Sequence, residues 1–80
     1  MTWHVYILKC SGGRLYTGAT TDVARRLEEH RSGKGGKFTR AFGVVQLLYS
    51  EACLDKSAAL VREAEIKRWP RLRKLALVAS

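Results

Sequence analysis

The sequence predicts an α+β domain, in which a small sheet is combined with helices. Two runs rich in aromatic and β-branched residues are separated by Ser-Gly-Gly near the start of the chain, and a third, strongly apolar run follows at 44–49. The segments between and after these runs consist of helix-forming residues that begin at Thr and Asp positions. Three strands and three helices are therefore expected.

The first two strands, 3–9 and 14–19, should form a hairpin. Its loop length decides whether Tyr6 and Tyr16 share a face, because side chains alternate along a strand. A two-residue glycine turn would send the two tyrosines to opposite faces, whereas a three-residue loop, Ser11–Gly13, puts them on the same face. Such loops commonly place glycine in a left-handed conformation, so we predict the three-residue loop.

A short helix should follow over residues 23–30. Thr20-Thr21-Asp22 supplies N-cap residues before it, and Ser32-Gly33 stops it. At about 100° per residue, two apolar positions define the core side of this helix. Arg26 and His30 are then expected to point toward the sheet and its rim.

Residues 31–43 are predicted to be a loop, rich in glycine and in cations that include Lys34, Lys37 and Arg40. The composition suits a loop lying over a phosphate backbone, and an exposed loop without a ligand is an equal alternative. The apolar run 44–49 is predicted to be the central strand, because it could be buried on both sides.

A longer helix is expected from Asp55 to Trp69, and Pro70 ends it or opens a last helix at 71–78. On the helical wheel Glu63 projects inside the apolar arc of this helix, whereas Glu65 falls on the polar side. A carboxylate in a packed arc could hold Mg²⁺, which typically takes one or two protein carboxylates and completes its shell with water and phosphate oxygens. The alternative is a salt pair between Glu63 and Lys67, one turn apart.

The length and charge of the chain bound its class. Eighty residues make one domain, 1–80, since roughly 100 to 200 residues per domain is usual. Fifteen Lys and Arg against seven Asp and Glu give a net charge of +8, which attracts polyanions, and nucleic acid is the expected partner. The simpler alternative is a chain kept soluble by its charge. A membrane surface is less favoured, because the cations are spread over several segments.

The cysteines indicate a cytoplasmic protein. Cys10 and Cys53 have no CxxC spacing and no signal peptide precedes them, so free thiols in a reducing compartment are expected. No apolar run approaches the roughly 18 residues needed to span a bilayer. The two cysteines and two histidines lack the spacing of a zinc finger.

Four further residues could take part in chemistry on a phosphate. A tyrosine such as Tyr6 or Tyr16 becomes a general base only if cations or a metal lower its pKa from about 10, and either could simply be a sheet residue. Arg26 suits a bidentate grip on phosphate oxygens, and His30 could orient water or protonate a leaving group. The alternative for Arg26 is an ion pair with a nearby glutamate. The alternative for His30 is a histidine at a helix end whose hydrogen bonds are satisfied within the protein.

Taken together, Val5-Tyr6-Ile7, Tyr16-Thr17-Gly18, Arg26, His30 and Glu63 resemble the GIY-YIG nuclease superfamily in order and spacing. The similarity covers nearly the whole chain, which looks like one of the small stand-alone bacterial proteins with a GIY-YIG domain and little else. The chain departs from the family pattern in two places. Its first tripeptide is Val-Tyr-Ile, and it contains no asparagine, although many larger members place one late in the domain.

The resemblance implies a three-stranded antiparallel sheet flanked by helices, and an endonuclease that hydrolyses phosphodiester bonds with one Mg²⁺ or Mn²⁺ ion. By carry-over, Glu63 would bind the metal and Tyr6 would act as or beside the general base. Tyr16 would position water or phosphate, and Arg26 would stabilise the transition state with support from His30. Lys34, Lys37, Arg40 and Lys67 are expected to contact nucleic acid.

Three hypotheses follow. The leading one is an enzyme that cleaves DNA, with low sequence specificity, in repair or processing; RNA is the less favoured substrate. The second is a binding module for DNA or RNA that kept the fold and the charge without useful turnover. The third is an interaction subunit whose apolar last helix docks on a larger protein or on a second copy of the chain.

Overall fold

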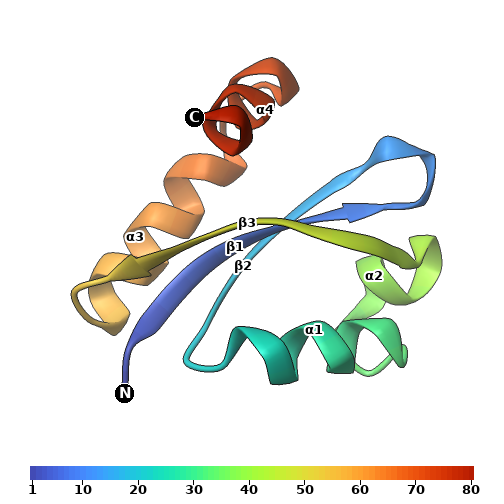
Figure 1. The fold of residues 1–80 in the computed structure, drawn as a ribbon, viewed down its shortest axis with the longest axis horizontal. Helices are drawn as coiled ribbons and strands as arrows, with labels where there is room; N and C mark the ends of the chain where they lie inside the picture. Colours follow the sequence, from blue (N-terminus) through green and yellow to red (C-terminus); the bar gives the residue numbers. More distant parts are fainter.

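The computed structural model describes residues 1–80 and contains three strands and four helices (Figure 1). In chain order they are β1 (Trp3–Cys10), β2 (Leu15–Thr20), α1 (Val23–Arg31), α2 (Lys37–Phe42), β3 (Val44–Cys53), α3 (Lys56–Lys67) and α4 (Arg71–Ala79). The strands form one antiparallel sheet in the order β2-β1-β3. The predicted fold class, an α+β domain with a three-stranded antiparallel sheet flanked by helices, is confirmed.

The sheet separates two pairs of helices. Figure 1 shows α1 and α2 on one side of the sheet and α3 and α4 on the other. On the α3 side, Val5 and Ile7 of β1 pack against Ala59 and Ile66, and all four side chains are fully buried. Because side chains alternate along a strand, the neighbouring Tyr6 points to the opposite face, toward α1.

The β1–β2 hairpin has the predicted three-residue loop. Ser11–Gly13 forms a single 3-10 turn, with Gly12 at φ 77° and Gly13 at φ 75°, values that suit glycine because it has no Cβ. The Cys10 N–H donates to the Arg14 carbonyl at 2.7 Å and closes the loop. Tyr6 lies opposite Gly18 and Tyr16 lies opposite Leu8, so both tyrosines face the same side of the sheet, as predicted.

The prediction that residues 44–49 form the central strand is wrong. The central strand is β1, and β3 lies at an edge and extends to Cys53. The pairing of β1 with β3 shifts register between Ile7 and Leu8 and again between Lys9 and Cys10, which leaves Leu48 and Val45 as extra residues on β3. A bulge interrupts the alternation of faces, so an edge strand can carry consecutive apolar residues.

The predicted loop at 31–43 is also only partly correct, because it contains helix α2. Gly36 at φ 143° precedes α2 and Gly43 at φ 69° follows it, and both are conformations that other residues rarely adopt. Between these glycines, Phe38 and Phe42 lie one turn apart with ring centroids separated by 5.0 Å. This pair was the apolar signal at helical spacing that the glycine-rich composition obscured.

Capping side chains fix where the helices on both faces begin. Asp22 accepts from the Arg25 N–H at 3.0 Å at the start of α1, and Asp55 accepts from the Ala58 N–H at 2.8 Å at the start of α3. At the other end of the molecule, Arg71 of α4 donates to the Gly13 carbonyl of the hairpin. None of the helices combines the length and the apolar character needed to cross a membrane.

Candidate active site

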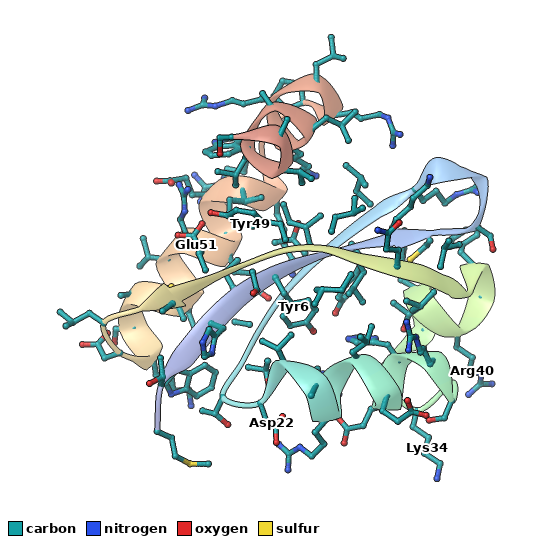
Figure 2. The ribbon with its side chains drawn as sticks, viewed as in Figure 1. Tyr6, Asp22, Lys34, Arg40, Tyr49 and Glu51 are labelled. Atoms are coloured by element: carbon teal, nitrogen blue, oxygen red, sulfur yellow. The ribbon has the colours of Figure 1, made fainter.

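A buried chain of hydrogen bonds joins the sheet to both helices on the α1 side. The Tyr6 hydroxyl lies 2.9 Å from His30 Nε2, and His30 Nδ1 lies 2.7 Å from Thr39 Oγ1. The three residues come from β1, α1 and α2, and each is at most 2% exposed. Figure 2 shows the Tyr6 side chain in the space between the sheet and α1. Both ring nitrogens of His30 are therefore engaged, which fixes the orientation of the ring.

Aromatic rings surround this chain of hydrogen bonds. The ring centroids of Tyr6 and Tyr16 are 6.4 Å apart, and Tyr16 meets the His30 ring edge-on at 5.0 Å. Phe38 of α2 covers Tyr16 from the outside at 5.8 Å. The separations fall in the range in which aromatic pairs attract one another. The sequence-predicted residues Tyr6, Tyr16 and His30 are thus brought together in one cluster.

Two glycines make room for the cluster. A Cβ at Gly18 would overlap the hydroxyl end of the Tyr6 ring, and a Cβ at Gly35 would lie 2.8 Å from the backbone Cα of His30. The contact at Gly35 is with the His30 backbone, which cannot rotate away as a side chain can. Gly18 is the last residue of Tyr16-Thr17-Gly18, so one physical role of this motif is to let the Tyr6 ring lie against β2.

Burial decides the protonation of the two central groups. Burial raises the pKa of the Tyr6 hydroxyl to about 12, although the nearby Arg26 guanidinium acts in the opposite direction. Burial also lowers the pKa of His30 below its usual value of 6.5, and the charge of Arg26 lowers it further. At neutral pH Tyr6 is therefore a phenol and His30 a neutral imidazole. The neutral imidazole can accept a proton from Tyr6.

Arg26 lies at the rim of the cluster, as its helical position predicts. Its guanidinium donates to the Gly35 carbonyl at 2.8 Å and to a Glu29 carboxylate oxygen at 3.1 Å. A third of the Arg26 side chain is exposed. The carboxylate of Glu29 raises the pKa of Arg26 above its already high usual value, with a further contribution from Tyr6. The simpler alternative, an ion pair with a nearby glutamate, is present in the structure.

Glu63 approaches the site from α3. Its side chain is 21% exposed and its carboxylate lies 3.6 Å from Lys67 Nζ, so the predicted one-turn salt pair also forms. The charge of Glu63 is near enough to raise the pKa of Tyr6, the smallest of the effects on that hydroxyl. Glu65, by contrast, is 52% exposed and pairs with Arg62 at 2.6 Å. Of the two glutamates, Glu63 is the less exposed and the one whose charge acts on Tyr6.

The donor set for a metal is sparse. Nowhere in the structure do three His, Cys, Asp or Glu side chains gather as ligands. Glu29 is bonded to Arg26 at the rim of the cluster, and Glu63 is the other carboxylate whose charge acts on Tyr6 or His30. A single carboxylate matches the demands of Mg²⁺, which usually keeps several waters and takes further oxygens from a substrate phosphate.

The cations expected to contact nucleic acid lie at the surface. Lys34, Lys37, Arg40 and Lys67 are all exposed. Lys34 follows α1, whereas Lys37 and Arg40 lie on α2, the helix that also carries Phe38 and Thr39. Figure 2 shows Lys34 and Arg40 extending outward from the α1–α2 end of the molecule, away from the sheet.

Thr39, Phe38, Gly18 and Gly35 are the site residues for which the sequence reasoning assigned no role. Thr39 has no motif around it, and its role arises only when α2 folds back on α1. Phe38 could have been found from its helical spacing to Phe42. Gly18 ends the motif Tyr16-Thr17-Gly18 and Gly35 lies in the predicted glycine-rich loop, but their steric roles depend on the positions of the Tyr6 and His30 rings.

Comparison with known proteins identifies the family. The sequence-family model of the GIY-YIG catalytic domain matches residues 2–76, nearly the whole chain. The chain belongs to the GIY-YIG family. Within that family it resembles small proteins named UPF0213. It is 49% identical to one from Desulfotalea psychrophila over 79 residues, which are 98% of this chain and 72% of the relative.

Further GIY-YIG relatives agree in size and fold. A UPF0213 protein of Streptococcus agalactiae is 52% identical over 75 residues, covering 94% of this chain and 85% of the relative. The solution NMR structure of a UPF0213 protein from Bacillus halodurans is 46% identical, with a TM-score of 0.62 over 99% of this chain and 84% of that one. The names of these relatives state no activity, so the activity of this GIY-YIG domain is a matter for proposal.

Proposed function

We propose that this GIY-YIG protein is a metal-dependent endonuclease that hydrolyses DNA phosphodiester bonds with little sequence specificity, in DNA repair or processing. The observation that carries the proposal is the buried chain Tyr6–His30–Thr39, in which a neutral imidazole is held against a tyrosine hydroxyl. A structural core would be satisfied by apolar side chains at these positions. Family membership supports the same conclusion.

Tyr6 and His30 would move the proton of the attacking water. In the tautomer whose Nδ1–H donates to Thr39, the Tyr6 O–H donates to His30 Nε2. When Tyr6 accepts a proton from water it passes its own proton to Nε2, so that hydroxide attacks phosphorus while Tyr6 stays neutral. Because the pKa of Tyr6 is raised to about 12, this relay avoids a free phenolate before the reaction.

Arg26 and Tyr16 would act on the phosphate. As negative charge develops on the phosphate oxygens, Arg26 would exchange its contact with Glu29 for a phosphate oxygen. The Tyr16 hydroxyl would orient the water or the phosphate beside His30. Glu63 would release Lys67 to hold the metal ion. The Mg²⁺ or Mn²⁺ ion would supply positive charge at the phosphate and the leaving oxygen.

The cations Lys34, Lys37, Arg40 and Lys67 would hold the nucleic acid. Contacts to phosphates carry no base information, which is the reason for expecting little sequence specificity. DNA is favoured over RNA as the substrate.

Cleavage by the purified protein tests the proposal. Supercoiled plasmid and labelled single-stranded DNA are incubated with Mg²⁺, Mn²⁺ or chelator, beside Glu63→Gln and Tyr6→Phe. Glu28→Gln is the matched control, because it changes an exposed glutamate that forms no ion pair and lies outside the site. Metal-dependent cleavage that Glu28→Gln keeps and the other two variants lose is expected. Equal cleavage by all four proteins would reject these assignments.

A second candidate function is a nucleic-acid binding module without turnover. Two observations favour it, the ion pairs that Arg26 and Glu63 already make with Glu29 and Lys67. In that case the protein binds DNA or RNA without cutting it, whichever metal ion is present, and Glu63→Gln leaves the affinity unchanged.

A further inference from the structure

A hollow on the far flank of α3 lies outside the candidate active site. It has a volume of about 330 Å³ and is lined by Val61, Glu65, Arg68 and Trp69. At about 100° per residue, these positions lie on the side of the helix axis opposite Glu63. A volume near the lower end of the range for ligand pockets, roughly 300 to 1,000 Å³, suits one small planar group.

The Trp69 ring in this hollow is covered by guanidinium groups. The central carbon of the Arg73 guanidinium lies 4.1 Å from the ring centroid, and that of Arg62 lies 5.1 Å away. Arg73 is exposed and bonds to no carboxylate in the structure. Trp69 packs in part against the core and is only half-buried, so another flat group could replace the exposed Arg73 guanidinium on its ring.

The segment that supplies Arg68 and Trp69 to the hollow is strongly positive. The segment 67–74 contains five Lys and Arg and no Asp or Glu. In the structure Lys67 alone of these five forms a salt bridge, and its partner, Glu63, faces the other flank of α3. The carboxylate that lines the hollow, Glu65, is held by Arg62 at 2.6 Å. The hollow is thus an aromatic surface beside cations that lack acidic partners.

We propose that this hollow is a second nucleic-acid site, in which one unpaired base stacks on Trp69 and the adjoining phosphates contact Arg68 and Arg73. When the base takes the place of the Arg73 guanidinium on the ring, that guanidinium becomes free to bind a phosphate. Aromatic side chains flanked by cations are the usual means of binding single strands. The inference rests on the proposed function insofar as nucleic acid is the ligand of both sites.

The first experiment measures the affinity for a labelled oligo-dT strand as salt is varied. Arg68→Gln/Arg73→Gln is compared with Arg25→Gln/Lys56→Gln, which removes the same charge from the first turns of α1 and α3. We expect the first variant to bind at least ten-fold more weakly than the control and its salt slope to fall by about 1.4, as for two lost single-strand contacts. Arg68→Gln alone keeps the Arg73 cover on Trp69 and should lose part of the affinity.

The second experiment reports on stacking. The chain has two tryptophans, so Trp3→Phe leaves Trp69 as the only emitter. We expect oligo-dT to quench the Trp69 emission, and an abasic strand of the same length to bind about five-fold or more weakly without quenching it.

Three outcomes would overturn the proposal. The first is an equal loss of affinity in the two double variants, and the second is Trp69 emission that oligo-dT leaves unchanged. The third is emission that changes with protein concentration alone, which would make the hollow a contact between copies of the chain. If metal-dependent cleavage persists in any of these cases, only the second site fails. If the parent protein binds no nucleic acid, both proposals fail.

Discussion

At the residue scale, the proposed chemistry depends on how His30 is held. A histidine with both ring nitrogens bonded and its pKa lowered by burial is poised as a neutral acceptor. Thr39 bonds Nδ1 and so holds the ring with Nε2 toward the Tyr6 hydroxyl. It touches neither the proposed water nor the phosphate, and therefore acts as a positioning residue.

Replacing Thr39 by Val should lower the cleavage rate about ten-fold, because His30 Nδ1 loses its partner and the ring is no longer held in one orientation. The buried nitrogen left without a partner should also cost about 1 to 3 kcal/mol of unfolding free energy. Thr39→Ser keeps the hydroxyl and should restore the rate. Initial rates and urea unfolding of both variants measure the two effects, and a Ser variant as slow as the Val variant would argue against positioning.

The pH profile follows from the lowered pKa of His30. Protonated His30 cannot accept the proton from Tyr6, so kcat/KM should be level near neutral pH and fall only below the usual histidine value of about 6.5. The free energy of unfolding should change with pH in the same direction as kcat/KM. The unfolded chain binds a proton at His30 below about pH 6.5 that the folded chain resists, so stability falls as pH drops from that value toward the folded pKa.

His30→Gln removes this titration, and its thermal midpoint should depend less on pH between about 6.5 and 5 than that of the parent. Calorimetric scans across this interval measure the difference. Parallel profiles for the two proteins would contradict the assignment.

At the element scale, the close approach of the α1–α2 connection to α1 determines the geometry of the site. Gly35 lies so near the His30 backbone that a Cβ would meet it at 2.8 Å, and its carbonyl holds Arg26. Gly35→Ala should therefore destabilise the protein by about 1 to 3 kcal/mol and lower the cleavage rate. Lys34→Ala, in the same connection but exposed, should change stability by no more than about 0.5 kcal/mol. Chemical denaturation compares the two.

Sequence reasoning succeeded for elements whose geometry is local. The hairpin loop could be predicted because the residues at 11–13 themselves favour an odd length, and with it came the shared face of Tyr6 and Tyr16. The place of β3 could not be predicted, because strand order depends on distant pairing and two bulges disguise its pattern. The motifs predicted that Tyr6, Tyr16 and His30 would lie together, whereas Thr39 joins them only through tertiary packing.

At the scale of the whole molecule, net charge and its distribution would decide how the proposed nucleic-acid ligand is held. Most of the predicted contacts, Lys34, Lys37 and Arg40, lie at one end beside the candidate active site, and the 67–74 cluster lies at the α3–α4 junction. The net charge of +8 draws polyanions to both.

Affinity for duplex DNA should fall linearly with salt on a double-logarithmic plot. Replacing Lys34, Lys37 and Arg40 by Gln should reduce the slope by about 2 to 3, since each duplex phosphate contact contributes about 0.9. Fluorescence anisotropy over a salt series measures the slope. An unchanged slope would show that these three cations lie outside the footprint.

The bulges of β3 also bear on how the protein avoids sticking to itself. β3 is a ten-residue edge strand, and a regular edge of that length would present an ordered row of free backbone groups to another chain. The extra residues at Val45 and Leu48 bend and twist this row. The same irregularity that hid the strand's position in the sequence thus works against edge-to-edge aggregation of the protein.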